Sequence, residues 1–465
     1  MTLFEDKISV DLELLKKYDQ PGPRYTSYPT APYFHEGIGY PEYIRHIEKD
    51  NESIENRDLS LYFHLPFCDT LCYFCGCNMM VTRNFEKIDK YIDYIEKEIH
   101  LLKQHISGDR KIIQLHWGGG TPTHLTPTQI LRLGKIIHNN FDFKEDAEVG
   151  VEIDPRELTF DHMKALRDMG FNRCSMGVQD FDDVVQKTVN RIQPEDITRQ
   201  TVNWSKELGF KSINLDLMYG LPFQKTETFS KTIDKVVSMD PDRLAVFNYA
   251  HLPDMIKHQK LIKDEWIPPR EEKLRLLKLS IDKLSDAGYR YIGMDHFAKP
   301  DDELTIAMEN GTLYRNFQGY STHAGINLFA MGITSISMLS DTYMQNVKNL
   351  KDYYRIIDQN KLPIMRGIIL NQDDIIRKEV ITELMCNFRL KKEKIEKKYA
   401  IHFDTYFAEA LDQLASLEED GLIEIQKDRL TVTNSGRLLI RNIAMKFDTY
   451  LMKKEKDKPQ FSRTV

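Results

Sequence analysis

Four of the six cysteines in the chain lie in one short stretch, CDTLCYFCGC, which runs from Cys68 to Cys77. The first three follow the spacing C-x3-C-x2-C, and the fourth comes two residues later. In a reducing compartment, such a cluster indicates metal binding or catalysis more than disulfide bonds. The remaining cysteines, Cys174 and Cys386, have apolar neighbours and are predicted to be core residues.

The composition is that of an ordinary globular protein of 465 residues, long enough for two domains or for one barrel with additions. Hydrophobic residues make up 41% of the chain, charged residues make up 29%, and the net charge is -7. Nothing here predicts binding to nucleic acid or to an anionic membrane. No apolar run has the length of a membrane span, and the acidic N-terminus MTLFEDKISVDLELLKKYDQ lacks a signal-peptide core. We therefore expect a cytoplasmic protein.

Short apolar segments that follow helical stretches predict a parallel sheet. The helical stretches MKALRDMG, Met163–Gly170, and WSKELG, Trp204–Gly209, both end in glycine directly before such a segment. This order is typical of the connection from a helix to a buried strand. Its repetition predicts an α/β fold with a partial, TIM-like (β/α)6 barrel. Seven segments are predicted to be strands: LSLYFHL from Leu59, KIIQLHW from Lys111, AEVGVEI from Ala147, FNRCSMGV from Phe171, KSINLDLMY from Lys211, DRLAVFNYA from Asp242 and YRYIGMDHF from Tyr289.

Chemically useful residues stand at or just after the predicted ends of six of these strands. In barrels of parallel strands, the active site is built at this edge. One polar strand end would be unremarkable, but six in order along the chain predict a site. The residues are Cys68, the stretch GGGTP from Gly118, Glu152, Gln179, Asp216 and the pair Tyr249-Ala250.

The pattern changes after about residue 350, where Lys and Glu become more frequent. The stretch ALDQLASLEEDGLIEIQKDRLTVTNSGRLLI, from Ala410, predicts a helix, two strands joined by a turn, and a helix, as in a winged-helix-like module. Its acidic residues Glu418–Asp420 favour a structural cap over DNA binding. The expected organisation is an N-terminal arm over 1–55, a barrel over 56–350, a mainly helical C-terminal domain over 351–452 and a disordered tail over 453–465.

Zinc and an iron–sulfur cluster are the two candidate occupants of the cysteine stretch, because thiolates bind soft metals. Zinc ribbons usually need two distant C-x2-C pairs, whereas this chain offers one cluster. A short loop can instead place three thiolates at three corners of a 4Fe-4S cluster, which leaves the fourth iron open. The glycines of HWGGGTPT let a ligand approach the backbone closely. This stretch matches neither a Walker loop nor G-x-G-x-x-G, so it does not predict a nucleotide phosphate site.

The cysteine spacing, with Phe74 before the last cysteine of the three, resembles that of the radical S-adenosylmethionine (SAM) enzymes. GGGTP resembles the motif that contacts the methionine part of SAM in that superfamily. The resemblance implies that Cys68, Cys72 and Cys75 hold a 4Fe-4S cluster whose open iron binds SAM. Reductive cleavage of SAM would then give a 5'-deoxyadenosyl radical. Cys77 matches a fourth cysteine that is not a cluster ligand in this group.

Further motifs resemble one family within this superfamily, the oxygen-independent coproporphyrinogen III oxidases, also called dehydrogenases. The resemblance covers nearly the whole chain, from about Lys17 into the C-terminal module. It rests on YFHLPFCDTLCYFCGCN and HWGGGTPTHL together with DQPGPRYTSYPTAPYF from Asp19, VEIDPREL, SMGVQDF, VNRIQP, NLDLMYGLP, NYAHLP and SISMLSDTYMQN.

This family resemblance implies roles for single residues, because the family binds two SAM molecules. The implied contacts of the cluster-bound SAM are Tyr62, Gly119, Glu152 and Ile336. The implied lining of the second SAM site is Phe74, Gly120, Thr121, Gln179, Arg191, Asp216 and Ala250. Carboxylates suit ribose hydroxyls and an ammonium group, and an arginine suits a carboxylate. The candidate contacts to the substrate are Arg24, Tyr25, His64 and Gln318.

The implied reaction is the oxidative decarboxylation of the ring A and ring B propionates of coproporphyrinogen III in haem biosynthesis. Both become vinyl groups, which gives protoporphyrinogen IX and two molecules of carbon dioxide. The expected partners are the substrate, a flavodoxin- or ferredoxin-type electron donor and an unidentified electron acceptor. The family also suggests a monomer.

Three alternatives to this function stay open. The first is the haem chaperone of the same lineage, which lacks the GPRYTSYPTA arm and typically has phenylalanine where Cys77 stands. The second is an anaerobic haem-degrading methyltransferase of that lineage, which the intact arm also disfavours. The third is a structural zinc protein.

Overall fold

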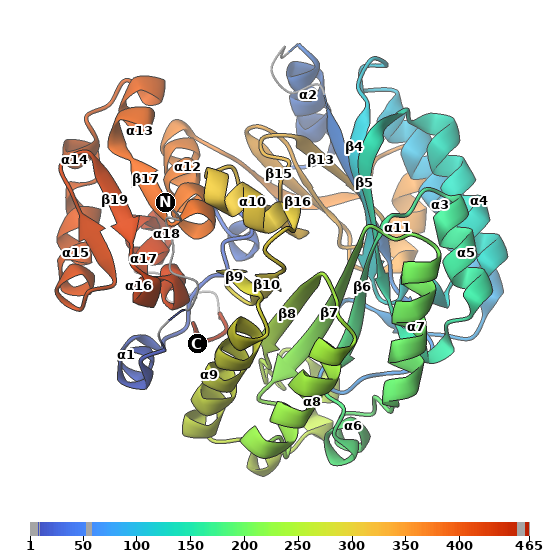
Figure 1. Ribbon diagram of the computed structural model, residues 1–465. Coiled ribbons are helices and arrows are strands. Elements are labelled where there is room, and N and C mark those ends of the chain that lie inside the picture. Colours follow the sequence, from blue (N-terminus) through green and yellow to red (C-terminus); the bar gives the residue numbers. More distant parts are fainter. Residues whose placement is uncertain (1–7, 9, 53–57, 453–460, 465) are drawn as a thin grey trace.

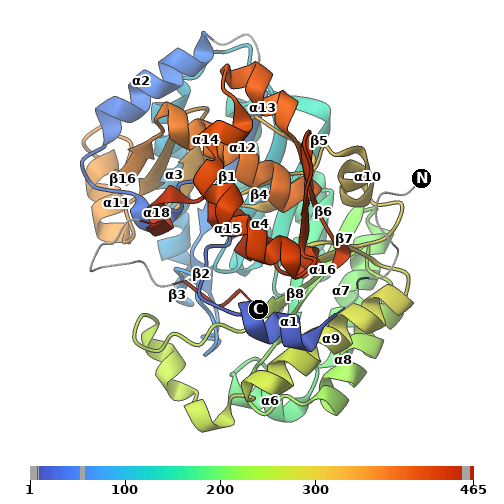
Figure 2. The same cartoon turned by 90° about the vertical axis from the view of Figure 1, so that its left-hand side faces the viewer.

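A large open sheet runs through the centre of the molecule. The structure, a computed structural model, describes residue 8 and residues 10–52, 58–452 and 461–464. Within these residues the sheet has twelve strands, in the order β16-β15-β14-β13-β1-β4-β5-β6-β7-β8-β10-β9. Figures 1 and 2 show the C-terminal domain beside this sheet, on the side away from helices α3, α4 and α5.

Six consecutive parallel strands form the part of the sheet that the sequence predicted. Each pairs in parallel with its neighbours in chain order, and helices cover the outer face (Figure 1). The predicted α/β class with six parallel units is confirmed, and the barrel is partial because the sheet stays open. The strands are β1 (Leu59–Leu65), β4 (Ile112–Gly119), β5 (Phe143–Ile153), β6 (Arg173–Gln179), β7 (Ser212–Tyr219) and β8 (Arg243–Asn248). The helices are α3 (Phe85–Lys103), α4 (Pro127–Asn140), α5 (Phe160–Asp168), α6 (Asp183–Thr188), α7 (Glu195–Glu207), α8 (Thr226–Ser238) and α9 (Arg270–Asp286).

Two of the predicted glycine connections have the backbone conformation that only glycine adopts easily. Gly170 follows α5 with φ +88°, and Gly209 follows α7 with φ +74°. Each glycine turns the chain directly into the next parallel strand. Hydrophobic residues of strands and outer helices, such as Trp117, Phe171 and Phe229, then pack into one core.

Four further strands extend the sheet beyond β1, and the sequence analysis did not assign them. β13 (Asn327–Met331) pairs in parallel with β1, and β14 (Ile336–Met338), β15 (Thr342–Asn346) and β16 (Ile364–Ile369) continue it antiparallel. Helix α11 (Leu350–Ile357) buries Tyr353 in the core of the large sheet. The domain boundary predicted at residue 350 is therefore wrong, because α11 and β16 belong with the sheet.

The seventh predicted strand is a hairpin and not one parallel strand. β9 (Arg290–Gly293) and β10 (His296–Ala298) pair antiparallel, and β10 also pairs antiparallel with β8. The positive φ of Met294, +53°, lies at the reversal between them. Helix α10 (Glu303–Asn310) follows, and then a separate two-stranded hairpin of β11 (Tyr314–Asn316) and β12 (Gly319–Ser321).

The C-terminal domain has its own core and contains the predicted order of elements. The expected helix, strands and helix are α15 (Ala408–Glu419), β18 (Ile423–Ile425), β19 (Arg429–Val432) and α16 (Asn434–Leu438). The other elements are α12 (Gln372–Asn387), β17 (Arg389–Lys391), α13 (Lys392–Tyr399), α14 (Phe403–Tyr406), α17 (Ile440–Ala444) and α18 (Thr449–Met452). Strands β17, β19 and β18 form a small antiparallel sheet. Leu384, Phe403 and Leu414 are fully buried in a cluster separate from the core of the large sheet.

The N-terminal arm contributes to both cores. Helix α1 (Leu12–Tyr18) buries Leu15 in the C-terminal domain, whereas α2 (Tyr40–Asn51) buries Tyr43 and Ile47 against the large sheet. The arm therefore joins the two parts of the protein along its length.

The four described residues of the C-terminal tail pair with this arm. The amide of Gly22 donates to the carbonyl of Ser462 (3.0 Å), and the amide of Thr464 donates to that of Gln20 (2.7 Å). Residues 453–460 and 465 of the predicted disordered tail lie outside the described residues. For 461–464 the prediction of disorder is wrong, because these residues have backbone partners that a composition argument does not reveal. Among the described residues, no helix has the length and apolar character needed to cross a membrane.

Candidate active site

The carboxyl ends of the parallel strands bring the predicted site residues to one edge of the sheet. The register places Glu152 opposite Ser175, and Gly177 opposite Asp216, on neighbouring strands. Gly119 stands opposite Leu65 at the end of β1, three residues before the cysteine stretch. The topology therefore gathers the strand ends that the sequence pattern predicted to meet.

The cysteine loop is held against this edge through its backbone. Strand β2 (Phe67–Cys68) pairs with β3 (Met80–Val81) at the two ends of the loop. Asn190 donates from its side-chain amide to the carbonyl of Leu71 (2.8 Å). Gln259 donates to the carbonyl of Phe74 (2.9 Å), and His258 to that of Cys75 (2.6 Å). These partners come from the segments after β6 and β8, so the barrel positions the loop, and cysteine spacing alone could not reveal them.

Two guanidinium groups face the buried thiol of Cys72. Arg156 Nη2 lies 3.4 Å and Arg191 Nη1 lies 3.6 Å from Cys72 Sγ. Asp154 bridges the two arginines, at 2.6 Å from Arg156 and 3.1 Å from Arg191. Burial opposes ionisation of Asp154, but Arg191 and Arg156 hold its pKa well below the usual range. This arrangement stabilises a negative charge on the sulfur, as a metal-binding thiolate requires.

The chemistry of the donors suits a thiolate-bound cluster. Cys68 Sγ lies 3.3 Å from the hydroxyl of Thr121, and Cys75 Sγ accepts a hydrogen bond from the amide of Cys77 (3.4 Å). Cys72 and Cys75 thus each accept a hydrogen bond at the sulfur, and Cys68 has a hydroxyl group within hydrogen-bond distance. Within the described ranges, no three His, Cys, Asp or Glu side chains are arranged to hold a single metal ion.

The glycines of GGGTP form a cradle in which side chains would collide. A Cβ on Gly118 would lie 2.9 Å from the carboxyl of Glu152, and one on Gly119 would lie 2.8 Å from the ring of His64. A Cβ on Gly120 would lie 2.7 Å from the backbone of Pro66. The amide of Gly119 donates to Glu152 Oε2 at 3.1 Å. The cradle therefore needs residues without side chains, as close approach of a ligand to the backbone requires.

Glu152 is the carboxylate at the centre of this edge. His116 Nε2 lies 3.6 Å from its Oε1, and the ring of Tyr62 stacks on His116 with centroids 6.1 Å apart. Burial raises the pKa of Glu152, but His116 and the amide of Gly119 outweigh it and hold the pKa below the usual range. A carboxylate that stays ionised here can bind an ammonium group or hydroxyls.

Asp216, on β7, is a second half-buried carboxylate at this edge. Ser175 donates to its Oδ2 at 3.0 Å, and Asn214 donates to its Oδ1 at 2.6 Å. Burial raises the pKa of Asp216 to about 6, although these hydrogen bonds lower it. Gln179, at the end of β6, has φ +67°, and its buried Oε1 has no hydrogen-bond partner among the described residues. Both side chains have acceptor atoms available to a ligand.

The remaining predicted SAM contacts lie around the same edge. Arg191 donates to the carbonyl of Gly177 (2.6 Å), and the carbonyl of Ala250 accepts from Gln259 (3.2 Å). Phe74 packs in an apolar cluster with Val189 and Tyr249. Ile336, at the start of β14, packs in the same cluster as Tyr62.

The four candidate substrate contacts are not brought together. Arg24 lines the larger of two cavities and pairs with Asp295, and Gln318 lines the smaller one. His64 lies in the cradle, with its Nδ1 3.2 Å from the hydroxyl of Tyr62. Tyr25 instead donates from its hydroxyl to Asp448 (2.9 Å) inside the C-terminal domain. Of the four, Arg24 and Gln318 are therefore best placed to contact a substrate.

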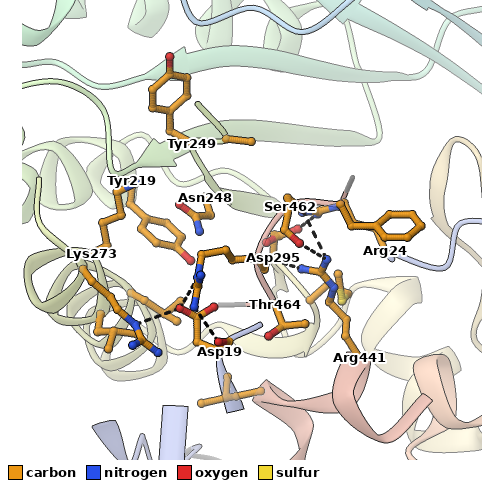
Figure 3. A pocket seen from close by; sticks show the side chains of 18 of the residues that line it. Asp19, Arg24, Tyr219, Asn248, Tyr249, Lys273, Asp295, Arg441, Ser462 and Thr464 are labelled. Atoms are coloured by element: carbon orange, nitrogen blue, oxygen red, sulfur yellow. Dashed lines mark hydrogen bonds and ion pairs between the residues drawn. The ribbon is translucent and has the colours of Figure 1, made fainter. Parts of the chain in front are cut away.

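The two cavities differ in size and lining. The smaller, of about 220 Å³, contains Glu152 and Asp216 together with Gln318 and Tyr320. The larger, of about 590 Å³, extends from Ala250 to the arm and the tail (Figure 3).

Asp154, Arg156, Asn190, His258 and Gln259 are the functional candidates that the sequence analysis missed. Asp154 and Arg156 lie within the quoted motif VEIDPREL, but their partners depend on the three-dimensional arrangement.

Comparison with known proteins agrees with this geometry. A family model described as Radical SAM superfamily matches residues 62–236 of the chain. A second family model, described as HemN C-terminal domain, matches residues 370–439. The chain is 50% identical over 459 residues to oxygen-independent coproporphyrinogen III oxidase of Escherichia coli strain K12, covering 99% of both chains. It is 46% identical over 469 residues to the protein of the same name from a Synechocystis species, covering 100% of both.

A solved structure agrees over the same length. The Escherichia coli coproporphyrinogen III oxidase, described as a radical SAM enzyme, matches with a TM-score of 0.91 and 48% identity, over 96% of this chain and 100% of that one. The sequence identity, its coverage and the shared fold lead to one conclusion. The chain belongs to the oxygen-independent coproporphyrinogen III oxidase family of the radical SAM superfamily.

Proposed function

We propose that this protein converts the ring A and ring B propionates of coproporphyrinogen III into vinyl groups without oxygen, giving protoporphyrinogen IX for haem biosynthesis. The observation that carries the proposal is the 50% identity, over 99% of both chains, to a relative with this activity in its name. The site supports it, because three thiols, a glycine cradle and two half-buried carboxylates meet at one edge of the sheet.

Cys68, Cys72 and Cys75 would hold the 4Fe-4S cluster. When bound, the cluster and SAM supply a 5'-deoxyadenosyl radical. Arg156 and Arg191, at 3.4 Å and 3.6 Å from Cys72 Sγ, can donate hydrogen bonds to this sulfur when it holds the cluster. The side chains that hold the loop backbone keep the three sulfurs at this edge.

Two SAM molecules would be held by the residues around the cradle. Tyr62, Gly119, Glu152 and Ile336 are assigned to the first, which binds next to the cysteine loop. Phe74, Gly120, Thr121, Gln179, Arg191, Asp216 and Ala250 are assigned to the second. Glu152 and Asp216 offer carboxylate oxygens to hydroxyl or ammonium groups, and the cradle offers close approach to the backbone.

Each of the two reacting propionates loses one hydrogen atom from its β-carbon, one molecule of carbon dioxide and one electron. The protein contributes orientation and exclusion of water from the reacting carbon. Arg24, Gln318 and His64 are the candidates for orienting the substrate. The arm and the tail cover the larger cavity, and Tyr25 ties the arm to the C-terminal domain through Asp448.

The expected partners follow from the electron balance. A flavodoxin- or ferredoxin-type protein would reduce the cluster, and an external acceptor would take one electron for each propionate. We propose that the protein acts as a monomer in the cytoplasm, where its thiols stay reduced. We also propose an arm over 1–55, followed by the sheet domain and a C-terminal domain that begins near residue 370.

An anaerobic assay tests the proposed function. Reconstituted protein is supplied with SAM, a reductant, a bacterial extract as electron acceptor and coproporphyrinogen III, and the oxidised porphyrins are separated. We expect protoporphyrin and the intermediate that keeps three propionates. The Cys72→Ala variant is expected to lose both the absorbance of the cluster near 400 nm and the products.

Other outcomes would contradict the proposal in distinguishable ways. Cleavage of SAM to 5'-deoxyadenosine without porphyrin products would keep the radical chemistry but reject this substrate. Tight haem binding without turnover would instead support the related haem chaperone. Iron content and a visible spectrum, measured on the same sample, separate both outcomes from a protein that holds only zinc.

A further inference from the structure

Three arginines, of which Arg315 and Arg441 are buried and Arg24 is half-buried, lie near residues that line the two cavities. Arg24 and Arg441 line the larger cavity, near the arm and the tail (Figure 3). Arg24 also lies over the ring of Phe247, with Cζ 5.9 Å from the centroid, and Phe247 lines the smaller cavity. Arg315 lies 4.7 Å from the ring centroid of Tyr320, another residue of the smaller cavity. We call Arg24, Arg315 and Arg441 the arginine cluster.

The arginine cluster has more positive charge than its described neighbours neutralise. Arg24 pairs with Asp295. Arg441 donates hydrogen bonds to backbone carbonyls, for example from its Nε to the carbonyl of Pro23 at 2.9 Å. Only 6% of the surface of Arg315 is exposed. Its Nε and Nη1 have no hydrogen-bond partner among the described residues. A buried guanidinium without an anion is destabilising, because it has lost its hydration without gaining a partner of opposite charge.

Among the residues that the structure describes, no carboxylate forms an ion pair with Arg315. Burial, together with Arg315 and Arg24, lowers the pKa of His296 well below its usual value, so this imidazole is neutral. Burial and the charges of Arg315 and Arg441 also lower the pKa of Arg24 to about 9. Gln318, on the same hairpin as Arg315, has a buried Nε2 without a hydrogen-bond partner in the part of the chain that the structure describes. Donors are in excess, so the site is prepared for an acceptor.

We propose that Arg315, assisted by Arg24 and Gln318, binds a propionate carboxylate of the substrate that is not being decarboxylated. The inference rests on the proposed function, since coproporphyrinogen III carries four propionates. A guanidinium can bind a carboxylate through two parallel hydrogen bonds, which fixes orientation as well as affinity. The aromatic rings of Phe247 and Tyr320, both close to arginines of the cluster, offer apolar surface to a tetrapyrrole.

The choice of a propionate that does not react follows from the direction of the reaction. Strong binding of the reacting carboxylate would stabilise the ground state and oppose its loss as neutral carbon dioxide. The lining of the smaller cavity includes Glu152 and Asp216, which are both proposed SAM contacts. It also includes Gln318 and Tyr320 from the hairpin of β11 and β12. A propionate held at the hairpin would therefore orient the porphyrinogen while another propionate reaches the SAM side.

Binding of coproporphyrin III, the fluorescent oxidised form of the substrate, tests the proposal without turnover. We expect Arg315→Met to weaken binding about ten- to a hundredfold, the range for a lost hydrogen bond to a charged group. Arg315→Lys keeps the charge and should lose less. Gln318→Leu removes one neutral donor and should weaken binding by about fivefold. Arg45→Met changes an exposed arginine on α2 and is the matched control.

Three measurements on each variant separate binding from folding. Iron content and the melting temperature report the fold, and formation of 5'-deoxyadenosine without substrate reports the SAM site. The proposal expects KM for coproporphyrinogen III to rise in Arg315→Met and Gln318→Leu, whereas Arg45→Met should keep the wild-type KM and the wild-type rate of 5'-deoxyadenosine formation. If Arg315→Met does not fold, Gln318→Leu decides alone.

The outcomes also distinguish this inference from the proposed function. Wild-type turnover together with unchanged coproporphyrin binding in folded Arg315→Met and Gln318→Leu would reject the carboxylate site and keep the function. A wild-type protein that neither binds coproporphyrin III nor converts the substrate would reject both. Equal weakening by Arg45→Met would show that the effect is a general loss of charge and would also overturn the inference.

Discussion

Among the three glycines of the cradle, Gly119 is the one that combines a positive φ with a close contact to its surroundings. Its φ of +118° is unfavourable for any residue with a side chain, and a Cβ would lie 2.8 Å from the His64 ring. We expect Gly119→Ala to lower the free energy of unfolding by about 1–3 kcal/mol, the usual cost of such a backbone strain. SAM binding should fall as well, because the amide of Gly119 would lose its position beside Glu152.

Thermal melting and equilibrium binding of SAM check this prediction. Gly108→Ala is the matched control, since a Cβ at Gly108 meets no atom within 4 Å. Equal melting temperatures and SAM affinities for the two variants would contradict the role of Gly119.

The residue types of the site were predictable from motifs, but their partners were not. The strand ends Glu152, Gln179 and Asp216 follow from the alternation of strand and helix. The pairing of Asp154 with Arg156 and Arg191 depends on how far each loop folds over the cysteine loop. No spacing in the sequence encodes that distance, since residues 156 and 191 are separated by a strand and two helices.

At the scale of elements, Glu98 joins α3 to the segments around β13 and α11. Its Oε2 accepts from the amide of Gly332 (2.8 Å) and the hydroxyl of Tyr353 (2.5 Å), and its Oε1 accepts from Asn346 (2.7 Å). Burial raises the pKa of Glu98 to about 7, against these hydrogen bonds. The unfolded value is about 4.3. The extra stability of the protonated form is complete below the unfolded value and is lost as the pH rises through about 7.

Glu98→Gln removes this titration. We expect the melting temperature of the wild type, relative to the variant, to fall by a few degrees between pH 5 and pH 7.5, since the linkage is on the order of 3 kcal/mol. Glu419→Gln changes an exposed glutamate on α15 and should show no such trend. A pH-independent difference between wild type and Glu98→Gln would contradict the shifted pKa.

The elements themselves were predictable where local signals agreed with the fold. Glycines such as Gly170 end helices and introduce the parallel strands, so six strands were identified correctly. Strands β13 to β16 are three to six residues long, and the pairing of β13 with β1, which joins them to the sheet, connects segments far apart in the sequence. In the segment from Tyr289, Gly293 and Asp295 stand at the reversal between β9 and β10, but the apolar residues on both sides led to the prediction of one continuous strand.

For the whole molecule, the contact of the arm with the tail determines how the larger cavity is closed. Asp19 is the buried centre of this contact, with Oδ2 2.6 Å from Arg463 and 3.1 Å from Arg270. These three residues come from the arm, the tail and α9, and all line the cavity. Composition predicted a disordered tail because the segment is rich in charged residues and poor in apolar ones, whereas the folded protein supplies Asp19 as a partner for Arg463.

Asp19→Asn is expected to loosen this closure and to destabilise the protein by about 1–3 kcal/mol, because two arginines lose a charged acceptor. Trypsin should then cleave faster after Arg24, which mass spectrometry detects. Asp428→Asn, which breaks an exposed pair with Arg429, should cost at most about 1 kcal/mol and leave the cleavage pattern unchanged. If the closure excludes water during turnover, Asp19→Asn should also form more 5'-deoxyadenosine for each vinyl group. Matching melting temperatures, cleavage rates and product ratios in the two variants would show that the cavity is closed by other contacts.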